Sequence, residues 1–93
     1  MSSRDELRIL REEVKKITAE IIRLCGVRLS LVSKIGEIKL MEGLPIEDSR
    51  VEKQLREAIL ENCRLYGINS QFGLRIFNLL LEESKRFQRD LTE

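Results

Sequence analysis

Between Leu7 and Ile38 the sequence repeats aliphatic residues at spacings of three and four, and one charged residue, Arg28, interrupts the pattern. Such spacing places the side chains on one stripe of a helix, and an apolar stripe is normally buried against another helix. The stripe comprises Leu7, Leu10, Val14, Ile17, Ile21, Leu24, Arg28, Leu31, Ile35 and Ile38. A buried arginine keeps its charge and needs an anionic partner. We therefore expect a carboxylate of the protein or of a ligand beside Arg28.

The composition indicates a single all-α domain formed by residues 1–93. The chain is 42% hydrophobic and 4% aromatic with one proline, and it is rich in Leu, Ile, Glu, Lys and Arg. Its net charge is +1 with cations and anions interspersed, so no nucleic-acid partner is expected. No apolar run approaches a membrane span and the N-terminus does not resemble a signal peptide. We expect a cytoplasmic protein without membrane contact.

The chain contains no histidine, which excludes a histidine general base, a Ser-His triad and the usual zinc sites. Cys25 and Cys63 lie far apart and lack the spacing of metal ligands. We interpret both as small buried hydrophobic residues in a reducing cytosol and expect no metal site.

Capping residues and glycines divide the sequence into three helices. The first is expected from about Asp5 to Met41, capped by Ser2 or Ser3 and followed by a loop over residues 42–47. The second begins after Asp48 or Ser49, where Ser49-x-x-Glu52 has capping-box spacing, and ends at Gly67. The third is capped by Asn69 or Ser70 and continues to about Leu91. Their inward residues are predicted to be Val51, Leu55, Ile59 and Cys63 on the second helix, and Phe77, Leu80, Leu81 and Phe87 on the third.

The very long first helix predicts a dimer. About 37 helical residues span roughly 55 Å, whereas a compact globule of this chain length measures only about 30 Å across. A monomer cannot cover the whole stripe, so a two-fold homodimer is the expected solution. A bare coiled coil would also cover the stripe, but the second and third helices argue against it.

Three cations on the first helix are candidates for binding an anion. Arg28 and Lys39 are eleven residues apart, which places them within about 20° of one helix face and roughly 16 Å apart along the axis. Arg11 lies about 25 Å from Arg28 and points elsewhere, so only an antiparallel partner chain could bring it to the same ligand. By themselves, Arg11 and Lys39 are more typical of a solvated flank of the stripe than of a binding site. The alternative for Arg28 is an internal salt bridge with a glutamate.

Two polar pairs complete the set of candidate site residues. Ser84 and Gln88 continue the inward stripe of the third helix, where buried polar groups need partners, although fraying of the helix end would give the same pattern. Asp48 and Glu52 lie four residues apart at the start of the second helix. They either cap that helix or accept hydrogen bonds from a substrate hydroxyl; the surrounding cations favour ordinary ionised carboxylates.

The ordered set of these motifs resembles the all-helical chorismate mutase family over nearly the whole chain. No single motif is specific for this family, but the order of the motifs and the separations between them are together specific for it. The matching segments are Leu10-Arg11-Glu12-Glu13-Val14, Arg28, Gly36-Glu37-Ile38-Lys39, Pro45-Ile46-Glu47-Asp48, Glu52 and Ser84-x-x-x-Gln88.

The resemblance implies an intertwined homodimer with three helices per protomer that rearranges the dianion chorismate to prephenate. It implies that Arg28, and Arg11 of the partner chain, bind the two substrate carboxylates with help from Ser84. Lys39 and Gln88 would donate to the ether oxygen of the breaking bond. Asp48 and Glu52 would hold the ring hydroxyl. Such a rearrangement requires no nucleophile, metal or cofactor, because positioning and electrostatic stabilisation suffice.

The sequence departs from the family pattern immediately before Glu52. The family commonly has an arginine there, whereas this chain has Val51 and carries the arginine one position earlier, as Arg50. One residue rotates a helix position by about 100°, so Arg50 is expected to point away from the site unless the helix start shifts. The alternatives to a mutase are an enzyme resembling isochorismate pyruvate lyase and a non-catalytic helical dimerisation module.

Overall fold

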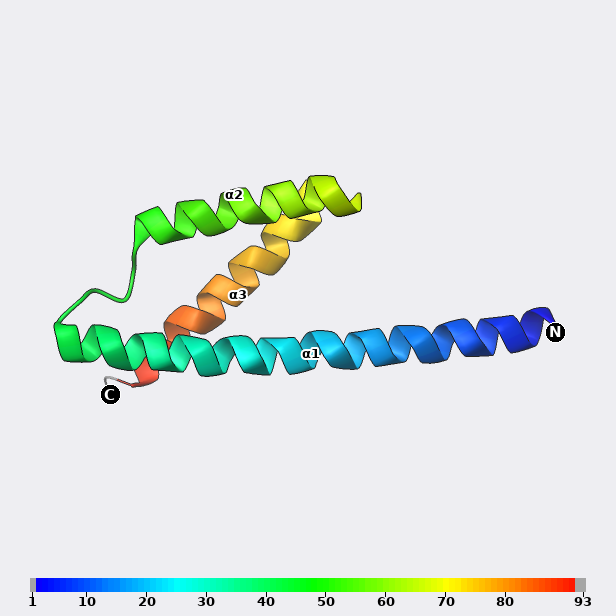
Figure 1. Cartoon of the computed structure of the whole chain (residues 1–93), viewed down its shortest axis with the longest axis horizontal. Helices are drawn as coiled ribbons and strands as arrows, with labels where there is room; N and C mark the ends of the chain where they lie inside the picture. Colours follow the sequence, from blue (N-terminus) through cyan, green and yellow to red (C-terminus); the bar gives the residue numbers. More distant parts are fainter. Residues whose placement is uncertain (1, 92–93) are drawn as a thin grey trace. The chain divides into compact units, whose positions relative to one another are not determined.

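The computed structural model describes residues 2–91 and contains three helices in that range (Figure 1). These are α1 (Ser3–Glu42), α2 (Ser49–Tyr66) and α3 (Ser70–Asp90). Residues 2–91 include no strand. The predicted all-α class with three helices is therefore confirmed. The chain divides into two compact units, of which one ends at Ser30 and the other begins at Leu31. None of the described helices is both long enough and apolar enough to cross a membrane.

Side-chain caps determine where each helix begins. At α1 the Ser2 hydroxyl accepts from the Asp5 backbone N–H at 3.2 Å and donates to the Asp5 carboxylate at 2.8 Å. At α3 the side-chain oxygen of Asn69 accepts from the Phe72 N–H at 3.0 Å. The bonds from the Asp5 and Phe72 N–H groups each satisfy a backbone donor that has no partner within the helix. Of the two caps considered for each helix, Ser2 and Asn69 are therefore the correct ones.

The cap of α2 is Asp48, whose Oδ1 accepts from the N–H groups of Arg50 at 3.1 Å and Val51 at 3.3 Å. Ser49 is already the first residue of the helix. The predicted capping box between Ser49 and Glu52 is consequently wrong. A carboxylate accepts strongly at the positive end of a helix, which accounts for the choice of the aspartate.

Two glycines end helices in the left-handed conformation that other residues rarely adopt. Gly67 has φ 66° and ψ 33°, and its N–H donates to the Cys63 carbonyl. Gly43 also has φ 66°, and the Leu44 N–H beyond it returns to the Lys39 carbonyl at 2.8 Å. The end of the second helix at Tyr66 was predicted correctly from Gly67.

Helices α2 and α3 pack most closely near the turn that joins them (Figure 1). Phe77 is 2% exposed and Cys63 is 5% exposed, and the Arg56 guanidinium lies over the Phe77 ring at 5.6 Å from its centroid. The predicted stripe of α2 is buried only at its C-terminal end, because Val51 and Leu55 are exposed. On α3, Leu80, Leu81 and Phe87 are half-buried. Cys63 matches its prediction as a buried thiol, whereas Cys25 is half-buried.

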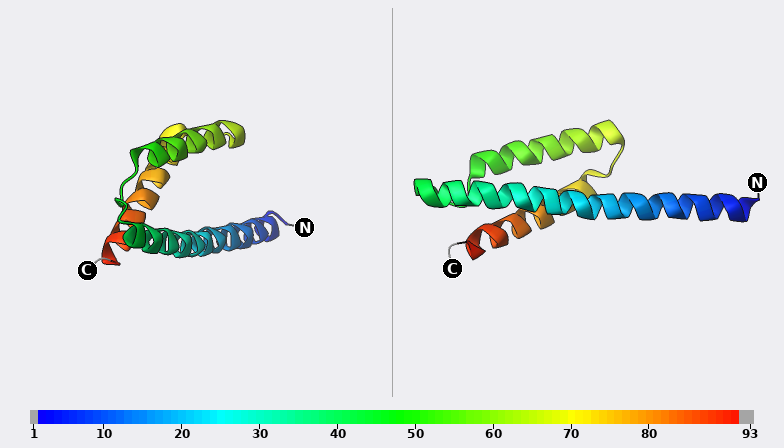
Figure 2. Two further views of the ribbon diagram at one scale, coloured as in Figure 1. Left: turned by 60° about the vertical axis from the view of Figure 1, so that its left-hand side comes forward. Right: turned by 60° about the horizontal axis from the view of Figure 1, so that its bottom comes forward.

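The end of α3 packs against the C-terminal part of α1 at Gly36 (Figure 2). A Cβ added at Gly36 would lie 2.8 Å from Leu91 Cδ1 and 3.1 Å from Gln88 Cγ. This glycine therefore permits a close approach of the two helices. A Cβ at Gly26 would meet nothing within 4 Å, so packing in the described chain does not explain that glycine.

Within the single chain, the heptad stripe of α1 is not buried. Its nine aliphatic members, from Leu7 to Ile38, are 46–63% exposed. Arg28 is half-buried. The buried hydrophobic residues in the described range are only Val32, Cys63 and Phe77. An apolar surface of this extent is typical of an interaction site, and the predicted partner surface for the stripe stays a prediction.

Replacing Gly73 with alanine is expected to lower the free energy of unfolding by up to about 2 kcal/mol. The new Cβ would overlap Cys63 Sγ. Overpacking of this kind costs about 1–3 kcal/mol, while alanine returns about 1 kcal/mol of helix propensity. Urea unfolding followed by circular dichroism measures the change. In a Cys63→Ala background the loss should shrink, and a loss of equal size there would contradict the overlap as its cause.

Candidate active site

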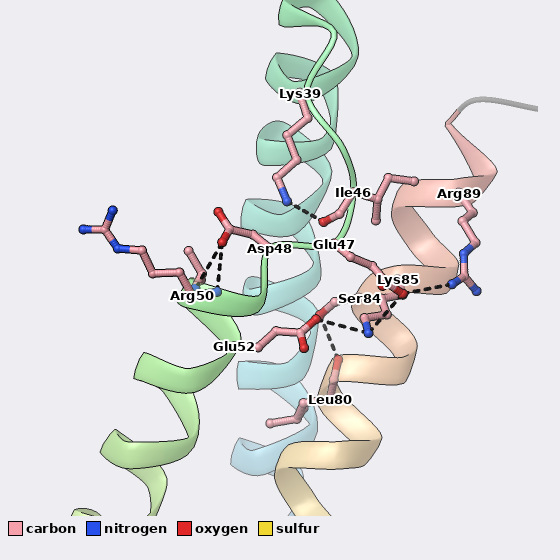
Figure 3. Close-up of polar contacts among 11 residues, drawn as sticks. Lys39, Ile46, Glu47, Asp48, Arg50, Glu52, Leu80, Ser84, Lys85 and Arg89 are labelled. Carbon is pink, nitrogen blue, oxygen red and sulfur yellow. Dashed lines mark hydrogen bonds and ion pairs between the residues drawn. The ribbon is translucent and has the colours of Figure 1, made fainter.

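Two polar side chains are buried on the inward face of α3. Ser84 is 8% exposed and Gln88 is 7% exposed. The Ser84 hydroxyl donates to the Leu80 carbonyl at 2.8 Å (Figure 3), and Gln88 Nε2 donates to the Val32 carbonyl of α1 at 3.3 Å. The second of these bonds is long for an N–H···O bond and correspondingly weak. The inward orientation of both residues is therefore confirmed, and fraying of the helix end does not explain the pattern.

Lys39 is half-buried near the end of α1, and its Nζ donates to the Ile46 carbonyl at 2.6 Å (Figure 3). The bond ties the loop before α2 to α1. An ammonium group has three N–H donors, so the bond to Ile46 uses only one of them. Lys39 can consequently hold the loop and donate to a bound anion or oxygen at the same time.

The carboxylates of Asp48 and Glu52 have different local roles. Asp48 caps α2 through Oδ1, so the capping interpretation is correct for it. Glu52 Oε1 lies 3.1 Å from Lys85 Nζ on α3, and the Glu52 side chain is 24% exposed. Glu52 is therefore ion-paired between two helices rather than engaged at the end of its own helix.

Lys85 is the residue of this region that the sequence did not single out. Its Nζ also lies 3.3 Å from Glu47 Oε1, and Arg89 Nη2 lies 3.7 Å from the same Glu47 oxygen (Figure 3). The hydrogen bond to Glu52, followed by the contacts with Glu47, raises the pKa of Lys85 above its ordinary value. The available signal was its position between Ser84 and Gln88, but a lysine in a charged helix end is also typical of a solvated face.

The sequence left open whether Arg50 replaces the arginine that the family commonly has directly before the residue matching Glu52. Figure 3 shows its side chain extending away from Glu52 and Lys85, while its backbone N–H serves the Asp48 cap. Val51 is 45% exposed. Arg50 thus does not supply a cation beside Glu52 in this structure, as its offset of one residue led us to expect.

The candidate residues are divided between the two units of the chain. Five of them, Lys39, Asp48, Glu52, Ser84 and Gln88, lie in the unit that begins at Leu31, which brings them into one structural unit. Arg11 is exposed and Arg28 is half-buried on the part of α1 that ends at Ser30. Their participation in the same site stays a prediction. Among residues 2–91, no cluster of three or more His, Cys, Asp or Glu side chains could hold a metal ion.

Comparison with known proteins shows which family the chain resembles along most of its length. The sequence model of the family described as chorismate mutase type II matches residues 10–89. The chain is 30% identical over 89 residues to the chorismate mutase of Methanocaldococcus jannaschii, which covers 96% of this chain and 90% of that protein.

Some relatives are much longer than this chain, and their names describe two enzymatic activities. The chain is 33% identical over 91 residues to a bifunctional chorismate mutase/prephenate dehydratase of Buchnera aphidicola, covering 98% of this chain. It is 26% identical over 93 residues to the protein of that name from Escherichia coli, covering 100% of this chain. The chain spans 24% of the length of each of these two bifunctional proteins.

Proposed function

The chain belongs to the type II chorismate mutase family, and on that premise we propose that it is a chorismate mutase, an isomerase that converts chorismate to prephenate. The observation that carries the proposal is the buried amide of Gln88 on α3. A buried polar side chain with one long hydrogen bond is suited to donate to a substrate oxygen. Its partner in this task is Lys39, from α1 of the same unit.

The reaction is an intramolecular Claisen rearrangement, in which an ether C–O bond breaks while a C–C bond forms. The enzyme has to hold a flexible substrate in its reactive shape, which removes much of the entropic barrier. Negative charge develops on the ether oxygen in the transition state. Lys39 Nζ and Gln88 Nε2 are the donors that we assign to that oxygen, and preorganised donors of this kind lower the barrier.

The remaining candidates bind the ends of the substrate. We assign Arg28, helped by the buried Ser84 hydroxyl, to one substrate carboxylate and Arg11 of a partner protomer to the other. Glu52 accepts a hydrogen bond from the ring hydroxyl, with Asp48 beside it. The Asp48 cap uses Oδ1, so its second carboxylate oxygen is the one assigned to the hydroxyl.

The proposed assembly is a homodimer that shares each site between two chains. Its support is the row of nine exposed aliphatic residues along α1, which needs a covering surface over most of the helix. A second copy provides a stripe of matching length and chemistry, since Ile and Leu at heptad positions pack into each other. We place the protein in the cytoplasm, where its two free cysteines stay reduced.

The direct test of the activity is the loss of chorismate absorbance on addition of the purified protein. Prephenate should appear in equal amount, and catalysis should proceed without added metal or cofactor. Formation of pyruvate instead of prephenate would identify a lyase. The absence of any chorismate turnover by the folded protein would contradict the proposal.

The assembly is tested separately by sedimentation velocity over a range of protein concentrations. A dimer should be the main species at concentrations where the enzyme is active. If the active species is a monomer, Arg11 of a partner protomer cannot bind the substrate. The assignments of Lys39 and Gln88 to the ether oxygen would be unaffected.

The catalysed rate is expected to change little between pH 6 and pH 8. The amide of Gln88 donates at any ordinary pH. The Glu52 contact raises the pKa of Lys85 above its ordinary value, so Lys85 keeps its charge throughout pH 6 to pH 8 and loses it only as the pH rises through that raised value. A pH profile of kcat and KM checks this expectation, and a steep fall from pH 6 to pH 8 would contradict it.

A further inference from the structure

Among the ion pairs between described residues, Lys85 is the least exposed cation, and it alone pairs with two carboxylates outside its own helix; Arg89, 59% exposed, shares one of these, Glu47. The Lys85 side chain is 22% exposed, whereas the arginines that pair three residues away along their own helix are 60–74% exposed. Its two partners belong to other parts of the chain, Glu47 in the loop before α2 and Glu52 on α2. Holding a lysine in such a place restricts a flexible side chain, so a structural benefit or a function has to accompany it.

The position of Lys85 places it beside the residues assigned to the substrate. It directly follows the buried Ser84 on α3, and its ammonium group lies between the carboxylates of Glu47 and Glu52 (Figure 3). Without that ammonium the two carboxylates would repel each other and would also repel a substrate that carries two negative charges. With it, Glu52 is held on the α3 side of α2 as an ionised hydrogen-bond acceptor.

The start of α2 provides no comparable cation. Arg50 extends away from Glu52 (Figure 3), and the residue directly before Glu52 is the apolar Val51. A positive charge at this end of the site therefore comes from α3. The ion pair spans two helices, so it also links the orientation of Glu52 to the helix that carries Ser84 and Gln88.

We propose that Lys85 is a positioning residue that orients the Glu52 carboxylate for the ring hydroxyl of the substrate and offsets its charge. This inference rests on the proposed mutase function. Lys85 acts through Glu52 and need not contact the reacting atoms. Because the hydroxyl contact exists in both the bound substrate and the transition state, its loss affects KM more than kcat.

The test measures kcat and KM for chorismate in Lys85→Ala and Lys85→Arg. The alanine variant should raise KM about 10-fold and change kcat by less than about 3-fold. The arginine variant should keep KM within about 3-fold of wild type, because its guanidinium keeps the positive charge and donates well to carboxylates. Arg86→Gln is the matched control: it removes an exposed cation whose partners, Glu83 and Asp90, lie on the same helix, and it should leave both constants unchanged.

A double-mutant cycle with Glu52→Gln tests whether Lys85 acts through Glu52. In that background, Lys85→Ala should change KM by less than about 2-fold, because the two substitutions share one interaction. A KM effect of Lys85→Ala that is just as large without the Glu52 carboxylate would overturn the proposal. Wild-type kcat and KM in Lys85→Ala would also overturn the proposal. Neither result affects the mutase assignment itself, which depends on the turnover of chorismate by the wild-type enzyme.

Protein stability separates positioning from folding. Thermal unfolding followed by circular dichroism should show the alanine variant folded at the assay temperature. If that variant does not fold, Lys85→Gln replaces it, since it keeps much of the side-chain stem and removes the charge. If the folded Lys85→Gln variant has the KM of the wild-type enzyme, the proposal that the positive charge of Lys85 positions Glu52 is wrong.

Discussion

Lys39→Ala is expected to lower kcat for chorismate by about 100- to 1,000-fold, the loss typical of removing one preorganised donor from a developing oxyanion. The ammonium group of Lys39 is half-buried and is held in place by the Ile46 carbonyl at 2.6 Å. On the proposed assignment, we expect it to donate to the substrate oxygen without first being ordered. Alanine removes both the charge and the donor, and nothing else on α1 replaces them at that position.

Stability should change much less than activity in this variant. The bond to Ile46 is a single charged hydrogen bond of a half-buried side chain, and its loss is expected to cost about 1.5–2 kcal/mol of unfolding free energy, the lower end of the range for such bonds. Lys34→Ala is the matched control, because Lys34 is an exposed lysine on the same helix. It should keep wild-type kcat. A Lys39→Ala enzyme within about 3-fold of wild type would remove Lys39 from the mechanism.

Arg28→Leu is expected to reduce kcat/KM by at least about 100-fold without lowering the unfolding free energy. The substitution removes the cation assigned to a substrate carboxylate, and a bidentate guanidinium–carboxylate contact is strong. At the same time leucine completes the aliphatic stripe from Leu7 to Ile38. Replacement of a buried or partly buried ion by a hydrophobic residue is often neutral or stabilising.

The two readouts together distinguish a binding role from a structural one. Steady-state kinetics measures the loss, and thermal unfolding at fixed protein concentration measures the stability. Arg23→Leu serves as the control, since Arg23 is exposed, lies on the same helix and pairs with Glu20 three residues away. Full activity in Arg28→Leu would show that this arginine does not bind the substrate, and a large loss of stability would show that it holds the fold.

The helices and their ends could be predicted from the sequence because they depend on residues close together in the chain. A cap needs a side chain and an N–H group two or three residues later, as Asn69 and Phe72 show. The αL residue Gly67 ends α2 by itself. Between adjacent candidates such as Asp48 and Ser49, however, the choice depends on backbone angles at a single residue, which the pattern does not distinguish.

Part of the candidate site could be predicted in the same way. Ser84 and Gln88 lie four residues apart, so their helical periodicity alone directs both inward, and both are buried in the structure. The extent of burial on α2 could not be predicted, because it depends on where α3 crosses that helix. Gly73 allows α3 to approach α2 at Cys63, and that crossing leaves Val51 and Leu55 exposed.

The sequence by itself determined that the chain is helical, that one stripe of α1 is apolar apart from Arg28, and that polar groups interrupt the inward face of α3. Periodicity encodes these features locally. Only the tertiary structure decided that Glu52 pairs with Lys85 instead of completing a cap, and that Arg50 extends away from it. Such partners come from different helices, and the distance between them depends on how those helices pack, which no spacing within one helix specifies.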